Sequence, residues 1–132
     1  MINQNCVIVL MRYLDEKIVY KNRGTPKIKI HNLKLDGYTT EEIFAAAKYI
    51  ADCGYVDLDA GIDIKGNRIN YKNSTPKHYH IRGITPKGYD FLSVVNTSSI
   101  WDKIRSNITS IESLLSVGKT ALEIIQYFNR TL

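Results

Sequence analysis

The chain has little cysteine, little proline and no long apolar run. Its 132 residues include two cysteines and three prolines, and its longest uninterrupted apolar run covers only residues 6–11. A membrane-spanning helix needs about 20 apolar residues, and no basic segment followed by an apolar run resembles a signal peptide. We therefore expect a cytoplasmic protein with no membrane segment. Cys6 and Cys53 fall on apolar positions of predicted helices, so we expect buried free thiols rather than a disulfide.

Acidic residues are missing from two blocks of the sequence. Residues 21–35 contain five Lys or Arg and no acid, and residues 64–89 contain six Lys or Arg and no acid. The block between them, residues 36–63, contains seven acids and one lysine, within a net charge of +5 for the whole chain. This separation of sign predicts a polarised surface with a basic side that attracts phosphate. The alternative is that these charges only keep a small domain soluble.

Patterns that indicate a reaction are missing too. Gly118-Lys119-Thr120 resembles the end of a phosphate-binding loop, but Ser113 stands where that motif requires glycine. His78 and His80 would lie on one side of a strand, yet a zinc site needs three or four ligands. No serine or cysteine falls in a nucleophile motif beside a histidine. We therefore expect no enzymatic activity, no catalytic residue, no metal site and no cofactor.

Helix and strand signals nevertheless recur along the chain. Apolar spacing predicts a helix over about Asn3 to Lys17, and alternation predicts a short strand over Lys27 to His31. Thr39 and Glu42 form a capping box that predicts a helix over Thr40 to Cys53, ended by Gly54. A strand is expected from Tyr55. Thr85-Pro86 combines a cap with a proline at the first helical position, which predicts a further helix through Val95.

Residues 68–82 favour a β-hairpin. Ile69, Tyr71, Tyr79 and Ile81 alternate with polar residues, and Asn73-Ser74-Thr75-Pro76 between them is typical of a turn. If those four face the core, the outer face of the hairpin holds Arg68, Asn70, Lys72, His78, His80 and Arg82. The order of helix, hairpin and helix predicts an α+β fold. We expect a winged helix-turn-helix-like domain over residues 1–95 and a C-terminal helical extension over residues 96–132.

Several of these motifs resemble a known family. They are Leu35-x-Gly37-Tyr38-Thr39-x-Glu41-Glu42-Ile43, Gly54-Tyr55-Val56, Ile84-Thr85-x-x-Gly88-x-Asp90-Phe91-Leu92 and Trp101-x-Lys103. Together, over about residues 1 to 105, they are similar to an uncharacterised family of small winged-helix proteins, a domain of unknown function common in phages and prophages. The resemblance implies a bacterial or phage protein of the cytoplasm, and it implies no activity or catalytic residue.

The charge pattern and the predicted hairpin together favour nucleic-acid binding, most simply to duplex DNA, with a regulatory or accessory role in a phage or mobile element. The expected contacts come from the hairpin and from a second basic patch: Arg68, Lys72, Lys77, His80 and Arg82, then Lys27, Lys29 and Lys34. The helix from Thr40 opposes close approach to phosphate, because it carries Glu41, Glu42 and Asp52 against Lys48 alone.

The alternative function is a protein-interaction module, such as a phage factor that binds and modulates a host protein. Its contacts would come from the acidic helix, through Glu41 and Glu42, or from the apolar C-terminal tail, through Ile125 and Phe128. The tail repeats apolar residues at helical spacing, namely Ala121, Ile124, Ile125, Phe128 and Leu132. Such a face either covers the domain's own core or pairs with a second copy to form a homodimer.

Overall fold

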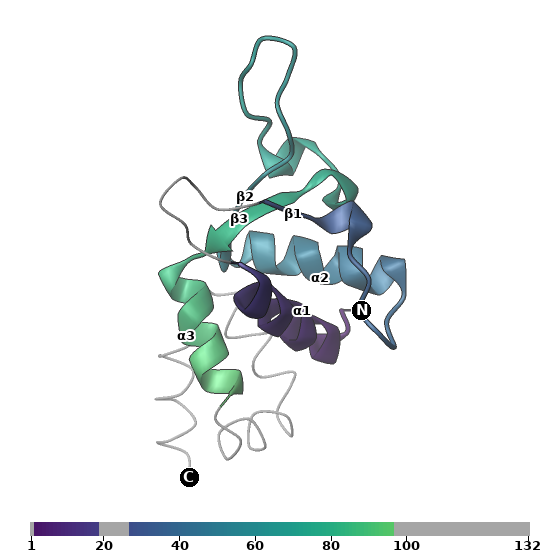
Figure 1. The fold of residues 1–132 in the computed structure, drawn as a ribbon, viewed down its shortest axis with the longest axis vertical. Helices are drawn as coiled ribbons and strands as arrows, with labels where there is room; N and C mark the ends of the chain where they lie inside the picture. Colours follow the sequence, from purple (N-terminus) through teal and green to yellow (C-terminus); the bar gives the residue numbers. More distant parts are fainter. Residues whose placement is uncertain (1, 19–26, 97–132) are drawn as a thin grey trace.

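The computed structural model describes residues 2–18 and 27–96. The elements run in the order α1 (Gln4–Lys17), β1 (Ile28–Lys29), η1 (Ile30–Asn32), α2 (Thr40–Asp52), β2 (Val56–Asp59), η2 (Tyr71–Asn73), η3 (Pro76–His78), β3 (His80–Ile84) and α3 (Pro86–Val95), where η denotes a 3₁₀ turn. The predicted α+β class is confirmed, and three helices with a small antiparallel sheet fit a winged-helix-like layout (Figure 1).

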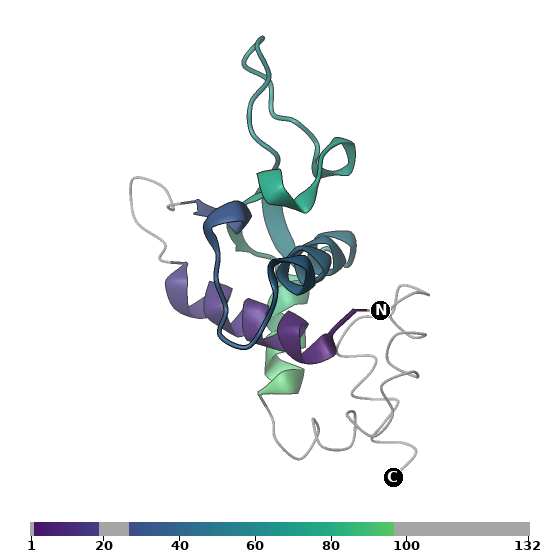
Figure 2. The same ribbon diagram turned by 90° about the vertical axis from the view of Figure 1, so that its right-hand side faces the viewer.

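The sheet has three strands in the order β1-β3-β2, so the last strand lies in the centre. β3 pairs antiparallel with both neighbours, and His80 of β3 lies opposite Lys29 of β1 and Asp59 of β2. The pairing of β2 with β3 is irregular between Asp57 and Leu58. Alternation along β3 buries Ile81 and leaves the flanking side chains on the other face. In Figures 1 and 2 the helices lie below the sheet, and a long connection between β2 and β3 extends away from the body.

The helices begin where the sequence predicts, because each has its own cap. Asn3 accepts a hydrogen bond from the Cys6 amide at the start of α1. Both halves of the Thr39–Glu42 capping box are present at α2. Thr85 accepts from the Gly88 amide at α3, with a proline in the first turn. These local hydrogen bonds satisfy N–H groups that the first helical turn leaves without partners.

One apolar core joins all three helices to the sheet. α1 and α2 pack against each other, and α3 packs on α1 and β3. The largest fully buried side chains are Tyr55, Tyr79, Leu10, Met11, Leu14, Ile30, Ile50, Ile81 and Cys6. Cys6 is buried as predicted, and burial raises the pKa of its thiol to about 11. Cys53 is also free but only partly buried, because it caps the exposed end of α2.

One strand prediction is wrong in extent, and one hairpin prediction is wrong in its pairing. The strand expected over Lys27 to His31 is only two residues long, because the chain turns into η1 at Ile30, whose amide donates to the Tyr79 carbonyl. The expected hairpin between residues 68–72 and 78–82 is not formed. Residues 71–78 fold instead into η2 and η3, and β3 pairs with β1 and β2. The predicted helical extension, apart from Asn96, lies outside the described residues.

Among residues 2–18 and 27–96, no helix is long and apolar enough to cross a bilayer.

Candidate nucleic-acid interface

The connection between β2 and β3, residues 60–79, is called the β2–β3 loop. It projects farther from the body than any other described segment (Figure 2). Its outer half is a narrow hairpin: the amides of Ala60 and Ile69 donate to the carbonyls of Ile69 and Gly61, and Ile62 pairs with Arg68. Hydrogen bonds within the loop therefore define the shape of the projection, although the loop is not part of the three-stranded sheet.

The loop tip, residues 62–68, is shaped by turn residues. The amide of Asp63 donates to the Asn67 carbonyl, and the amide of Gly66 donates to the Asp63 carbonyl. The Asp63 carboxylate accepts from the amides of Lys65 and Asn67, each at 2.9 Å. Gly66 has φ +85°, the left-handed conformation that closes a three-residue hairpin loop. Asp63, Gly66 and Asn67 thus build the turn and leave Ile64 and Lys65 at its apex.

The inner half of the β2–β3 loop is fixed to the body. Tyr71 meets Tyr79 edge to face, with ring centroids 5.7 Å apart. η3 packs against both η1 and α2. The Asn70 side chain accepts from the Lys72 amide and starts η2, while Pro76 starts η3. These contacts hold the base of the projection against the domain.

The β2–β3 loop carries four lysine or arginine side chains and one acid, Asp63. Lys65, Arg68, Lys72 and Lys77 are all exposed. Within the described part of the chain, none of the four forms an ion pair. The one carboxylate of the loop, Asp63, forms no ion pair with them, so the loop carries a net positive charge that faces solvent.

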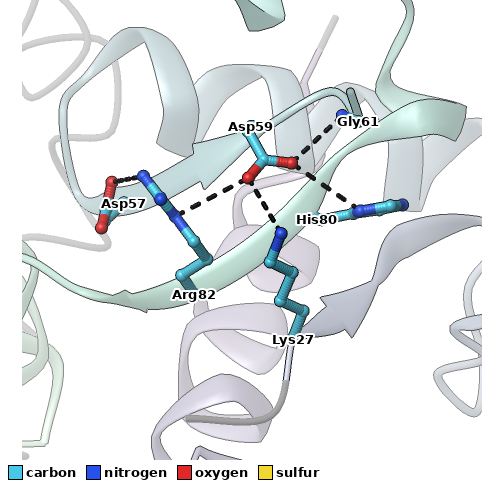
Figure 3. A network of polar contacts seen from close by, with 6 residues as sticks. All are labelled: Lys27, Asp57, Asp59, Gly61, His80 and Arg82. Atoms are coloured by element: carbon cyan, nitrogen blue, oxygen red, sulfur yellow. Dashed lines mark hydrogen bonds and ion pairs between the residues drawn. The ribbon is translucent and has the colours of Figure 1, made fainter. Parts of the chain in front are cut away.

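A second group of charges surrounds a buried carboxylate on the sheet (Figure 3). Asp59 is only 2% exposed and accepts from the Gly61 amide at 3.1 Å. Its oxygens lie 3.3 Å from Lys27 Nζ, 3.8 Å from Arg82 Nε and 3.7 Å from His80 Nδ1. Arg82 also pairs with Asp57 at 2.7 Å.

Burial raises the pKa of Asp59, but the Gly61 hydrogen bond and the charges of Lys27 and Arg82 outweigh it. The net effect is a pKa below the usual value of 3.8. Asp59 is therefore an anion that neutralises its basic neighbours. The charges of Lys27 and Arg82 are correspondingly less available to phosphate than those of the β2–β3 loop.

The predicted basic residues thus form two separate groups rather than one outer hairpin face. Arg68, Lys72 and Lys77 lie on the β2–β3 loop, whereas Lys27, His80 and Arg82 gather around Asp59. Lys29 and Lys34 are exposed, in β1 and after η1. The single-face prediction is wrong because the amides of Asn73, Ser74, His78 and Tyr79 donate within 3₁₀ turns instead of in a strand ladder.

The acidic helix α2 presents few free charges. Lys48 pairs with Asp52 at 2.7 Å, one helical turn apart. Glu42 accepts from the Thr39 amide and, at 2.6 Å, from the Asn3 side chain, and these bonds lower the pKa of its carboxyl below 4.5. Glu42 therefore joins α1 to α2, while Glu41 is exposed and stays a candidate for binding a protein partner. Ile125 and Phe128, the other partner candidates, lie outside the described residues.

Sequence reasoning missed two features of this interface. Asp57 and Asp59 alternate with Val56 and Leu58, a period-two signal that places both carboxylates on the face shared with Arg82. The loop tip exposes two isoleucines, Ile62 and Ile64. No sequence pattern predicts their exposure, because an apolar residue in a loop can equally be a core position. In the described residues, no group of three His, Cys, Asp or Glu side chains is placed to hold a metal ion.

Comparison with protein-family models, with curated proteins and with solved structures found no match to this chain.

Proposed function

We propose that this chain is a winged-helix protein that binds duplex DNA through the β2–β3 loop, with a regulatory or accessory role in a phage or mobile element. The observation that carries the proposal is the projecting loop with four exposed basic side chains and no ion-pair partner among the described residues. Phosphate attracts such side chains through charge alone, so sequence-independent binding is expected. In this assignment the β2–β3 loop is the wing, and α2 stands in the place of a recognition helix.

The charge of α2 supports a dominant role for the loop. A helix inserted in the major groove approaches phosphates on both sides. Here the exposed lysine of α2 is already paired with Asp52, and Glu41 faces solvent in the first turn. We therefore expect the contacts to come from Lys65, Arg68, Lys72 and Lys77, with Lys29 and Lys34 as a second exposed patch, rather than from α2. The phage association rests on the motif resemblance.

The test is the salt dependence of binding to a labelled duplex, measured by fluorescence anisotropy. With about six phosphates neutralised, log K should fall with log salt at a slope near −5. Arg68→Ala should reduce the magnitude of that slope by about one. The matched control is Lys17→Ala, which removes one exposed charge at the end of α1 and should leave the slope unchanged.

Three results would overturn the proposal. They are no binding at low salt, a flat salt response, and equal effects of the Arg68 and Lys17 variants. The last would mean that only the overall charge matters.

A further inference from the structure

The most exposed large apolar side chains of the described residues lie on the loop tip. Ile62 is 62% exposed and Ile64 is 104% exposed, while the other large exposed hydrophobic residue, Tyr89, is on α3. A single exposed apolar residue needs no explanation. Two at the end of the farthest projection, beside Lys65 and Arg68, form a small apolar wedge with a basic rim.

Turn chemistry does not account for Ile64. Asp63, Gly66 and Asn67 make every hydrogen bond of the tip, and the apex position imposes no demand that isoleucine meets better than a polar residue. β-branched residues are also uncommon in tight turns, where Gly, Asn, Asp and Ser dominate. The hydrogen bonds nevertheless hold the apex rigidly, so presenting Ile64 to a partner requires no reordering of the tip.

The charges around the wedge select its partner. Lys65 and Arg68 favour an anionic rim around an apolar slot, and the Asp63 carboxylate, which accepts from backbone amides, forms an ion pair with neither of them. A base step of duplex DNA seen from the minor groove has this arrangement, with stacked base faces between two rows of phosphates. Proteins that bend DNA insert isoleucine and similar side chains between such base pairs. Reading the major groove would instead favour polar donors at the apex.

We propose that the loop tip enters the minor groove of duplex DNA and that Ile64 wedges between two base pairs, with Lys65 and Arg68 on the flanking phosphates. This inference rests on the proposed function and adds a groove and a deformation to it. The wedge partly unstacks one step and kinks the duplex by roughly 20–90°. Flexible pyrimidine–purine steps are the easiest to open, so the protein prefers them without reading bases.

The test uses the full chain and a 20-base-pair duplex with a central TA step, carrying 2-aminopurine at that step in one sample and dyes at both ends in another. Wild-type protein should raise the 2-aminopurine emission and shorten the end-to-end distance. Ile64→Ser should remove both signals and weaken binding about tenfold. Its salt slope should not change, since no charge is lost. Ile64→Leu keeps an apolar wedge and should retain both signals.

Competition and a lipid control complete the design. Netropsin, which occupies the minor groove, should displace the wild type. Salt-dependent binding with no 2-aminopurine signal, no effect of Ile64→Ser and no competition would overturn the wedge and leave the proposed function intact. Absence of any duplex binding would overturn both. Binding to phosphatidylserine vesicles that Ile64→Ser abolishes, with duplex binding unaffected, would overturn the wedge and assign the tip to a membrane surface.

Discussion

At the scale of single residues, Asp59 decides how the sheet face is charged. Its carboxylate is buried where β2 ends, and three basic groups converge on it, one from the segment before β1 and two from β3. Burying a charge is costly unless partners and hydrogen bonds compensate. Arg82 Nε is itself buried with no hydrogen-bond partner, so it depends on the nearby Asp59 charge. Asp59 therefore fixes the start of the β2–β3 loop, because it also binds the Gly61 amide.

We predict that Asp59→Asn lowers the free energy of unfolding by about 1–3 kcal/mol at pH 7, because a charged partner is removed from a buried cluster. Urea denaturation measures the loss as a lower midpoint with an unchanged slope. Asp57→Asn is the matched control. That carboxylate is 60% exposed, so its pair with Arg82 is screened and the variant should lose less than about 1 kcal/mol. Equal losses in the two variants would contradict this role for Asp59.

The difference in stability between the wild type and Asp59→Asn should depend on pH. The pKa of Asp59 is lower in the folded state than its usual 3.8, so its contribution to stability is fully present above that pH. The contribution disappears as pH falls through the folded-state pKa and the carboxylate takes up a proton. The stability difference between the wild type and Asp59→Asn should therefore shrink in acid below about pH 4. A difference that stays constant from pH 7 to pH 2.5 would show that charge is not its cause.

At the scale of elements, α3 is positioned by the close approach of Gly88 to the backbone of Tyr55, directly before β2. A Cβ added to Gly88 would lie 2.1 Å from the Tyr55 carbonyl oxygen and 2.7 Å from Ile84 Cγ2. Glycine within a helix normally costs about 1 kcal/mol relative to alanine. Here the contact with backbone reverses that preference, because the oxygen cannot move without moving the sheet.

Gly88→Ala should therefore destabilise the domain by about 1–3 kcal/mol or more, through overpacking. Thermal unfolding followed by circular dichroism should show a lower Tm. Asp90→Ala changes an exposed residue of the same helix and should leave the Tm close to that of the wild type. A Gly88→Ala variant as stable as the wild type would mean that α3 is not packed this closely on Tyr55.

Elements with local signals were predictable, and the others were not. The capping box at α2 and the Thr85-Pro86 start of α3 are decided within four residues, so the sequence predicts them correctly. The alternation of Ile69, Tyr71, Tyr79 and Ile81 equally fits a strand pair and a looped segment whose tyrosines pack on each other. In the structure this segment forms 3₁₀ turns, and η3 packs against η1 and α2, which lie far away in the sequence. The sequence-based candidates included Arg68, Lys72 and Lys77 but not Lys65, and the division of the basic residues between the β2–β3 loop and Asp59 depends on that packing.

At the scale of the whole molecule, the charge blocks of the sequence become distinct surfaces. The acid-rich block forms α2 and β2, where Asp52 pairs with Lys48 and Asp59 pairs with Lys27. The second basic block forms the β2–β3 loop and β3, and its unpaired charges lie on the projection. If the chain binds nucleic acid as proposed, this positive projection favours rapid, salt-sensitive association.

The C-terminal tail adds a prediction about assembly. Its apolar residues follow helical spacing, and a face of this kind is covered either by the domain itself or by a second copy. We expect a homodimer, since two-fold pairing is the commonest closed assembly. Light scattering at tens of micromolar should then give twice the 15.1 kDa of one chain.

Ile125→Asp should yield a folded monomer if the tail pairs between copies, because each chain keeps its own core. The same change in the domain's own core would bury an unpaired charge and unfold the protein, and a monomeric wild type would refute the dimer outright.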